Sequence, residues 1–294
     1  MLISEKASSA DNQQETYHRM GILRDYTSDI VNEKLVALIA FLFTDGGISK
    51  HGVNSWRIFF ANSSIPAIKM FKKLLVDIFK ISPTRIQVKP RQGHHYFVKL
   101  TSKEIGNFLI ERFGTFRTLK FKNEKFPRTS IPIKWLEQTK TVPLFLKITF
   151  SMDGGMKFYP MRNLSTGYRW LERGIDLACH HPVLRDQYCY LLKKLGIRPT
   201  NVEKDKVIKI RRRENLERFA KTVGFLDGVT VTRHSKFWIG KEKNEVMRLM
   251  LKSYGNHHLF LARPNFNHDN DIVRTAWRHA ELARNVLANK IEKF

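Results

Sequence analysis

Two apolar segments of the chain end in the same way. Residues 38–47 read LIAFLFTDGG and residues 146–155 read LKITFSMDGG, so each apolar run ends in an aspartate followed by two glycines. Such runs predict buried helices, and glycine lets the chain leave a helix in conformations that other residues resist. The two acids, Asp45 and Asp153, are 108 residues apart. The repetition indicates a duplicated unit.

The segments that follow the two acids repeat one order of patterns. Residues typical of strands come first, and then a helix opens at Pro66 in the first copy and at Pro182 in the second. Proline is favoured in the first turn of a helix. These helices end in ISPT and IRPT, which are 116 residues apart. We therefore expect about eight extra residues in the first hairpin of the second copy, since a surface loop tolerates insertion.

A second hairpin and a second helix complete each copy. Alternating apolar residues predict hairpins over residues 85–100 and 201–213. The helix after each hairpin has the same apolar spacing in both copies, for example at Phe108 and Phe219, which are 111 residues apart. Each unit is therefore predicted to run helix, hairpin, helix, hairpin, helix.

This order, headed in each copy by an apolar helix that ends in Asp-Gly, resembles the LAGLIDADG homing endonucleases in their single-chain, two-motif form. The resemblance covers roughly residues 35–252. The family's motif has small residues at its third and seventh positions, as Ala40 and Thr44 are, whereas the second copy has Ile148 and Met152.

The resemblance implies a fold class and a division of the chain. The expected fold is α/β (α+β), with two pseudo-symmetric αββαββα domains that form a DNA-binding saddle of antiparallel sheets. The expected parts are an N-terminal extension at 1–34, a first repeat at 35–140, a second repeat at 141–252 and a C-terminal helical extension at 253–294.

The two helix-ending acids call for a compensating positive charge. A carboxylate beside the negative end of a helix dipole is destabilising, and the resemblance implies that Asp45 and Asp153 come together, where like charges repel. A divalent cation such as Mg²⁺ relieves both effects, because it binds carboxylate oxygens and keeps positions for water and phosphate. A single Asp-Gly is more often a helix cap than a metal site. Its duplication favours metal-dependent phosphodiester cutting, with one acid for each strand.

The resemblance also implies a basic residue near the attacking water, on the segment after the second helix of each repeat. In the first repeat this segment is FRTLKFKNEKF, with Lys120 or Lys122. In the second repeat it is VTVTRHSKFWIGKEK, with Lys236 or Lys241. We assign Lys122 and Lys236 to the site, although a given lysine in so basic a chain is more often a surface charge or a phosphate contact.

The polar positions of the hairpins predict a surface that reads DNA. An antiparallel sheet covered by helices on one face leaves a polar face open, and a ribbon of strands fits the major groove. There Arg and Gln read base edges while Lys neutralises phosphates. The candidates in the first repeat are Arg57, Arg85, Gln87, Lys89 and Lys99, with Arg91 in the turn. Those in the second are Lys157, Arg162, Arg169, Lys206, Lys209 and Arg211.

The charge of the chain supports nucleic acid as the partner. Its 294 residues include 52 Lys and Arg against 27 Asp and Glu, a formal net charge of +25, and a polyanion is the usual partner for such an excess. The positive charge is spread along the chain, and the longest apolar run, residues 35–43, is too short to cross a bilayer, so no membrane is expected. The polar N-terminus does not read as a targeting peptide, and two cysteines outside any CxxC pair suit a reducing, cytoplasmic compartment.

We therefore expect an intracellular, monomeric homing endonuclease that makes metal-dependent double-strand breaks at a long, nearly palindromic duplex site. The alternative is a protein that keeps the fold without cutting, either an intron RNA maturase or a DNA-binding regulator. Both acids are present, which favours the enzyme. Clusters of His and Cys, such as those at 94–95, 179–181 and 257–268, lack the ligand spacing of zinc or HNH-nuclease sites.

Overall fold

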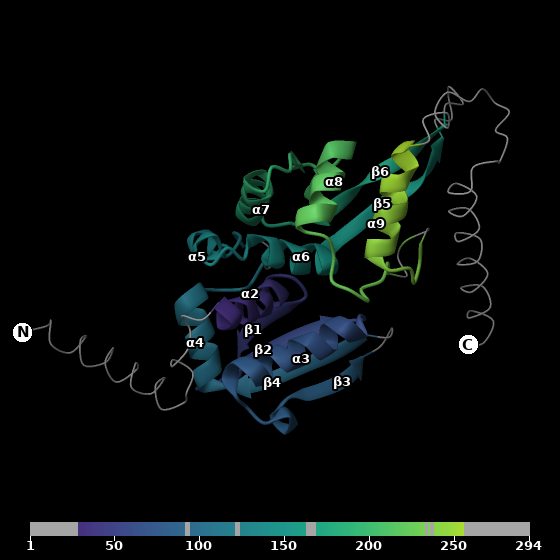
Figure 1. Ribbon diagram of the computed structural model, residues 1–294. Helices are drawn as coiled ribbons and strands as arrows, with labels where there is room; N and C mark the ends of the chain where they lie inside the picture. The colour runs from purple at the N-terminus through teal and green to yellow at the C-terminus, as the bar shows by residue number, and fades with distance from the viewer. Residues whose placement is uncertain are drawn as a thin grey trace, which may run out of the picture. The chain divides into compact units, whose positions relative to one another are not determined.

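The computed structural model describes residues 29–91, 95–120, 124–162, 169–232, 235 and 238–255 (Figure 1). The chain divides into two compact units. The first comprises Met1–Arg117 and Pro127–Phe145, and the second comprises Thr118–Phe126 and Leu146–Phe294. The predicted C-terminal helical extension lies almost entirely outside the described residues, as do residues 1–28 of the N-terminal extension.

The first unit follows the predicted order of elements. It contains α2 (Asp29–Phe43), β1 (Gly46–Lys50), β2 (Trp56–Asn62), α3 (Ile65–Phe79), the short 3-10 helix η1 (Pro83–Arg85), β3 (Gln87–Arg91), β4 (His95–Ser102), α4 (Lys103–Phe113) and α5 (Ile133–Gln138). Its four strands form one antiparallel sheet in the order β1-β2-β4-β3.

Serine and proline residues define where the helices of the first unit begin. The Ser64 side chain accepts a hydrogen bond from the Ala67 N–H, and Pro66 occupies the first turn of α3, as predicted. The Ser102 side chain caps α4 in the same way by accepting from the Ile105 N–H. Each hairpin is thereby separated from the helix that follows it.

Alternation along the strands gives the first sheet one buried face and one open face. Ile58, Phe60 and Val98 are fully buried beneath α3, which lies across this face (Figure 1). The Phe60 ring packs against Phe41 of α2 and Phe71 of α3, with ring centroids 5.0 Å apart in both pairs. The aromatic core therefore holds the end of α2 against the sheet.

The second unit repeats the same architecture. It contains α6 (Val142–Asp153) from Leu146 onward, β5 (Gly154–Arg162), β6 (Arg169–Ala178), α7 (Pro182–Lys194), β7 (Thr200–Val202), β8 (Val207–Ile210), α8 (Arg213–Thr222), α9 (Lys243–Lys252) and η3 (Ser253–Gly255). Its strands pair in the order β5-β6-β8-β7, which is the order of the first sheet. The predicted fold of two αββαββα units with antiparallel sheets is confirmed.

The extra residues of the second copy lengthen its strands. β5 and β6 have 9 and 10 residues, whereas β1 and β2 have 5 and 7. The pairing of β5 with β6 continues without interruption from Gly154↔Leu177 to Arg162↔Arg169. The extra residues therefore lie in the first hairpin of the second copy, as predicted, and most of them extend its ladder of backbone hydrogen bonds.

Buried apolar residues also define the inner face of the second sheet. Phe158, Ile175 and Ile208 are fully buried, as are Leu192 of α7 and Phe219 of α8. Figure 1 shows α9 lying along β5 and β6. The opposite face of this sheet is open, as in the first unit.

Candidate active site and nucleic-acid interface

Asp45 is held in place where α2 meets β1. Its carboxylate oxygen Oδ2 accepts a hydrogen bond from Asn62 Nδ2 at 2.6 Å, and its main-chain oxygen accepts from the Ala61 N–H at 3.1 Å. The Asn62 amide is oriented in turn because its oxygen accepts from the Ser64 N–H at 2.7 Å. The last residue of β2 therefore orients the first candidate catalytic acid, a role that the apolar and polar pattern did not reveal.

The glycine after each acid is required by close backbone packing. A Cβ atom on Gly46 would lie 2.7 Å from the Phe41 carbonyl oxygen and 2.9 Å from that of Phe59. A Cβ atom on Gly154 would lie 2.3 Å from the Phe150 carbonyl oxygen. All three distances are shorter than van der Waals contact, so the chain can turn from helix into strand directly after each acid only through glycine.

The helix that carries Asp153 ends on a buried lysine. Lys243, the first residue of α9, is 4% exposed, and its ammonium group donates to the carbonyl oxygens of Ser151 and Gly154 at 2.6 Å and of Phe150 at 3.4 Å. A cation at this position satisfies the last carbonyls of α6 and opposes the negative end of its dipole.

Lys243 is the last residue of the segment in which a basic residue was expected. The expected Lys236 lies outside the described residues, and Lys241 forms a partly exposed ion pair with Glu245 at 3.7 Å. Helical spacing places Lys243 on the apolar stripe of α9 with Val246 and Met250, both buried. A lysine on such a stripe signals an ammonium group with internal partners. Lys122, the expected residue of the first repeat, also lies outside the described residues.

The cysteine nearest to the second acid is unreactive at neutral pH. Burial raises the pKa of the Cys179 thiol from 9.0 to about 11, and the charge of Asp153 contributes in the same direction. The thiol is therefore protonated at neutral pH and is a poor metal ligand.

The two aspartates fit a hard divalent cation. Both side chains are partly exposed, and their oxygens are the donors that Mg²⁺ prefers. Within the described ranges no three His, Cys, Asp or Glu side chains cluster closely enough to hold a cation by themselves. A single carboxylate in each unit leaves most of the coordination to water and phosphate, as at Mg²⁺ sites that bind together with a nucleic acid.

The open face of the first sheet is basic. The strand register places four of the predicted DNA-binding residues there, namely Arg57, Gln87, Lys89 and Lys99. Strands β1 to β4 contain no Asp or Glu. Two of the predicted positions differ. Arg91 ends β3 instead of lying in the turn, and Arg85 belongs to η1, because the Ser82 side chain caps a 3-10 turn there.

Two arginines of this face are positioned by ring systems. The Arg91 guanidinium lies 3.9 Å from the ring centroid of Phe97, and Arg57 Nη2 contacts His51 Nδ1 at 2.8 Å. Arg57 Nε is buried and has no hydrogen-bond partner among the residues that the structure describes.

The predicted DNA-binding residues of the second repeat do not all lie on the open face of its sheet. Lys157 and Lys209 lie on its open face, and Arg211 follows β8 directly. Lys206 lies in the turn between β7 and β8 with a φ of 53°. Arg162 and Arg169 pair at the ends of β5 and β6, and their side chains are outside the described part of the structure.

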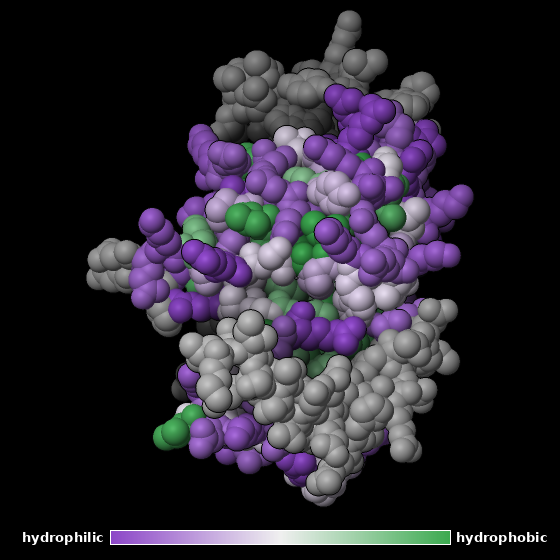
Figure 2. All heavy atoms as spheres, turned by 90° about the vertical axis from the view of Figure 1, so that its left-hand side faces the viewer, coloured by the Kyte–Doolittle hydropathy of each residue, from purple (hydrophilic) through white to green (hydrophobic). Residues whose placement is uncertain are grey.

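The face of the molecule drawn in Figure 2 is mostly polar. On the face drawn in Figure 2 hydrophilic side chains are widespread, and hydrophobic ones form small, separate patches. Within the described part of the chain, no helix has both the length and the apolar character of a membrane span.

No family model matches the chain, and no curated protein matches its sequence. Its fold is similar to solved structures of homing endonucleases. A variant of I-DmoI in complex with its target DNA and Mg is 15% identical, and the match covers 67% of this chain and 98% of that chain with a TM-score of 0.46. I-WcaI bound to its DNA recognition sequence is 18% identical, with 69% and 84% covered and a TM-score of 0.42.

A third structure is that of the LAGLIDADG homing endonuclease I-LtrWI bound to target DNA. It is 9% identical, and the match covers 76% of this chain and 90% of that chain with a TM-score of 0.47. The resemblance to the LAGLIDADG homing endonucleases that the sequence predicts is thus found among solved structures as well.

Proposed function

We propose that the protein is a metal-dependent endodeoxyribonuclease that makes double-strand breaks at a long, nearly palindromic DNA site. One observation carries the proposal. In each of two units with the same topology, a partly exposed aspartate ends an apolar helix beside a glycine that no larger residue can replace. An acid at a helix C-terminus does not help the helix form. An aspartate at the C-terminus of the corresponding helix in both units therefore supports a chemical role for the two acids.

The chain's own residues have distinct tasks in this proposal. Asp45 and Asp153 would hold a divalent cation such as Mg²⁺, one acid for each DNA strand. A bound cation supplies the Lewis acidity that phosphodiester hydrolysis needs. Asn62 orients the Asp45 carboxylate, and Lys243 fixes the helix end that presents Asp153. Lys122 and Lys236 are proposed as the basic residues beside the attacking water.

Double-stranded DNA is the proposed partner of both open sheet faces. The lysines of the first sheet suit phosphates, and Gln87 and Arg57 suit base edges in the major groove. We further propose that the protein acts as a monomer inside the cell, since one chain already contains both units.

The proposal is tested with the purified chain and a linear duplex that carries the locus where its own gene is inserted. We expect double-strand breaks with Mg²⁺ and none with EDTA. Two controls are the same duplex with a scrambled centre and a transcript of the flanking intron. Tight binding of the structured transcript, with no DNA scission in Mg²⁺ or Mn²⁺, would instead identify an RNA maturase.

A further inference from the structure

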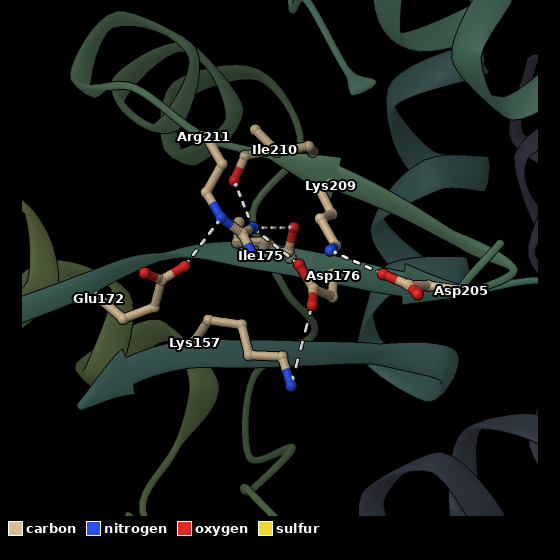
Figure 3. Close-up of polar contacts among 8 residues, drawn as sticks. All are labelled: Lys157, Glu172, Ile175, Asp176, Asp205, Lys209, Ile210 and Arg211. Carbon is tan, nitrogen blue, oxygen red and sulfur yellow. Dashed lines mark hydrogen bonds and ion pairs between the residues drawn. The ribbon is translucent and has the colours of Figure 1, made fainter. Parts of the chain in front are cut away.

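The open faces of the two sheets differ in charge. The first sheet contains no acid, whereas β6 places Glu172 and Asp176 on the open face of the second sheet. These acids lie between Lys157 of β5 and Arg211, which follows β8 (Figure 3). A carboxylate on a surface that approaches a polyanion opposes binding unless it makes a favourable contact of its own.

Arg211 is bound to the protein by several contacts (Figure 3). Its Nε lies 3.1 Å from Glu172 Oε1, and its Nη1 lies 2.7 Å from Asp176 Oδ1. Nη1 also donates to the carbonyl oxygens of Ile175 at 3.2 Å and Ile210 at 3.1 Å. Because protein acceptors use Nε and Nη1, Arg211 is better placed to fix the two carboxylates than to grip a phosphate.

Gly174 makes room for this arrangement. A Cβ atom at position 174 would lie 2.2 Å from Arg211 Nη1 and 2.5 Å from its Cζ. The guanidinium therefore lies against the backbone of β6, between the side chains of Glu172 and Asp176. Any larger residue at position 174 would displace it.

The lysines of this face have acidic partners. Lys157 Nζ is 3.8 Å from Asp176 Oδ2, and Lys209 Nζ is 3.1 Å from Asp205 Oδ2. On the first sheet, Lys89 and Lys99 form no ion pair within the described residues. The second face therefore has fewer unpaired cations to neutralise phosphates.

The charges of both acids reach a neighbouring side chain on the second face, where Arg211 and Lys209 act in the opposite direction. Burial raises the pKa of Tyr159, and the charges of Glu172 and Asp176 raise it further. Tyr159 pairs directly with Glu172 across the β5-β6 ladder. The acids thus retain influence on this surface although Arg211 lies between them.

We propose that Glu172 and Asp176 read bases in the half-site that binds the second sheet, by accepting hydrogen bonds from cytosine amino groups. The inference rests on the proposed binding of DNA. Carboxylates accept from cytosine N4 in the major groove and repel the acceptor atoms of guanine and the phosphates. The first sheet, by contrast, presents Lys89 and Lys99, which form no ion pair among the residues that the structure describes. Acidic acceptors therefore contribute to base reading in one half-site only, whereas the other half-site meets Arg, Lys and Gln side chains.

A purely structural role makes a different prediction. If the ion cluster only joins β6 to β8, its removal lowers stability slightly and leaves base preference unchanged, because partly exposed ion pairs contribute little. Base preference is therefore the readout that separates the two roles.

The test is selection of bound duplexes from a randomised library, carried out with the full chain in EDTA so that no cutting is needed. We compare the wild type with Glu172→Gln and Asp176→Asn. Each variant should lose about 10-fold of its preference for cytosine at one or two positions of one half-site, and should gain adenine there, because an amide pairs with adenine. Random duplexes should bind more tightly.

Two control variants show which half-site of the DNA target the acids read. Asp205→Asn removes the acid that pairs with Lys209 in the exposed turn and should leave the preference unchanged, whereas Gln87→Ala should alter the other half-site. An unaltered consensus in both acid variants, with native melting temperatures, overturns the inference. A chain that selects DNA in this way but never cuts it refutes the proposed nuclease alone, and one that binds no duplex refutes both.

Discussion

Asp45→Asn is expected to leave target binding intact while double-strand cutting falls by at least about 1,000-fold. The substitution keeps the shape of the side chain and an oxygen that can still accept from Asn62 Nδ2, so the helix end should stay in place. It removes the negative charge on which a divalent cation depends. The measurement is the rate of linear product from supercoiled plasmid, with the dissociation constant determined separately in EDTA.

A matched control lies in the same unit. Asp77→Asn removes an acid that pairs with Lys34 at 3.0 Å on the surface, and it should change the cutting rate less than about 2-fold. Asp153→Asn should reproduce the Asp45→Asn result. Wild-type cutting by either helix-end variant would show that these carboxylates do not perform the chemistry.

Lys243→Met is expected to lower the free energy of unfolding of the second unit by about 3 kcal/mol. Methionine fills a similar volume but leaves the carbonyl oxygens of Ser151 and Gly154 buried without their donor. Because those carbonyls flank Asp153, cutting should also fall under conditions in which the protein is still folded. Urea denaturation followed by circular dichroism, and cutting rates well below the transition, measure the two effects.

The control for this substitution is two residues away in sequence. Lys241→Met removes a partly exposed ion pair with Glu245 and should cost less than about 1 kcal/mol. Equal stability of both variants would mean that the buried ammonium group contributes nothing to the end of α6.

The order of elements was predictable because local signals repeat. Pro66 and Pro182 open corresponding helices, and the same alternation of apolar residues precedes α4 and α8. Each of these signals acts within a few residues, where propensity and burial agree. The spacing of these signals also placed the extra residues of the second copy in its first hairpin, whereas their pairing into longer strands depends on the partner strand and not on local pattern.

The finer features of the candidate site depend on tertiary contacts. That Arg211 meets Glu172 and Asp176 follows from the register of β6 with β8, which a single strand pattern does not contain. From the sequence alone Asn62 is typical of a turn. Its role in orienting Asp45 is visible only from the hydrogen bond between the two side chains. Lys243 was within reach of sequence reasoning, since its position on an apolar helical stripe signalled burial.

The most direct test of the account maps the cation itself. Fe²⁺ is a substitute for Mg²⁺ at oxygen sites, and with ascorbate and peroxide it cleaves a polypeptide close to where it is bound. In the complex with target DNA we predict protein cleavage near residues 45 and 153, each lost in the corresponding Asp→Asn variant. Cleavage elsewhere, or an unchanged pattern in the double variant, would contradict the claim that the two helix-ending acids hold the catalytic metal.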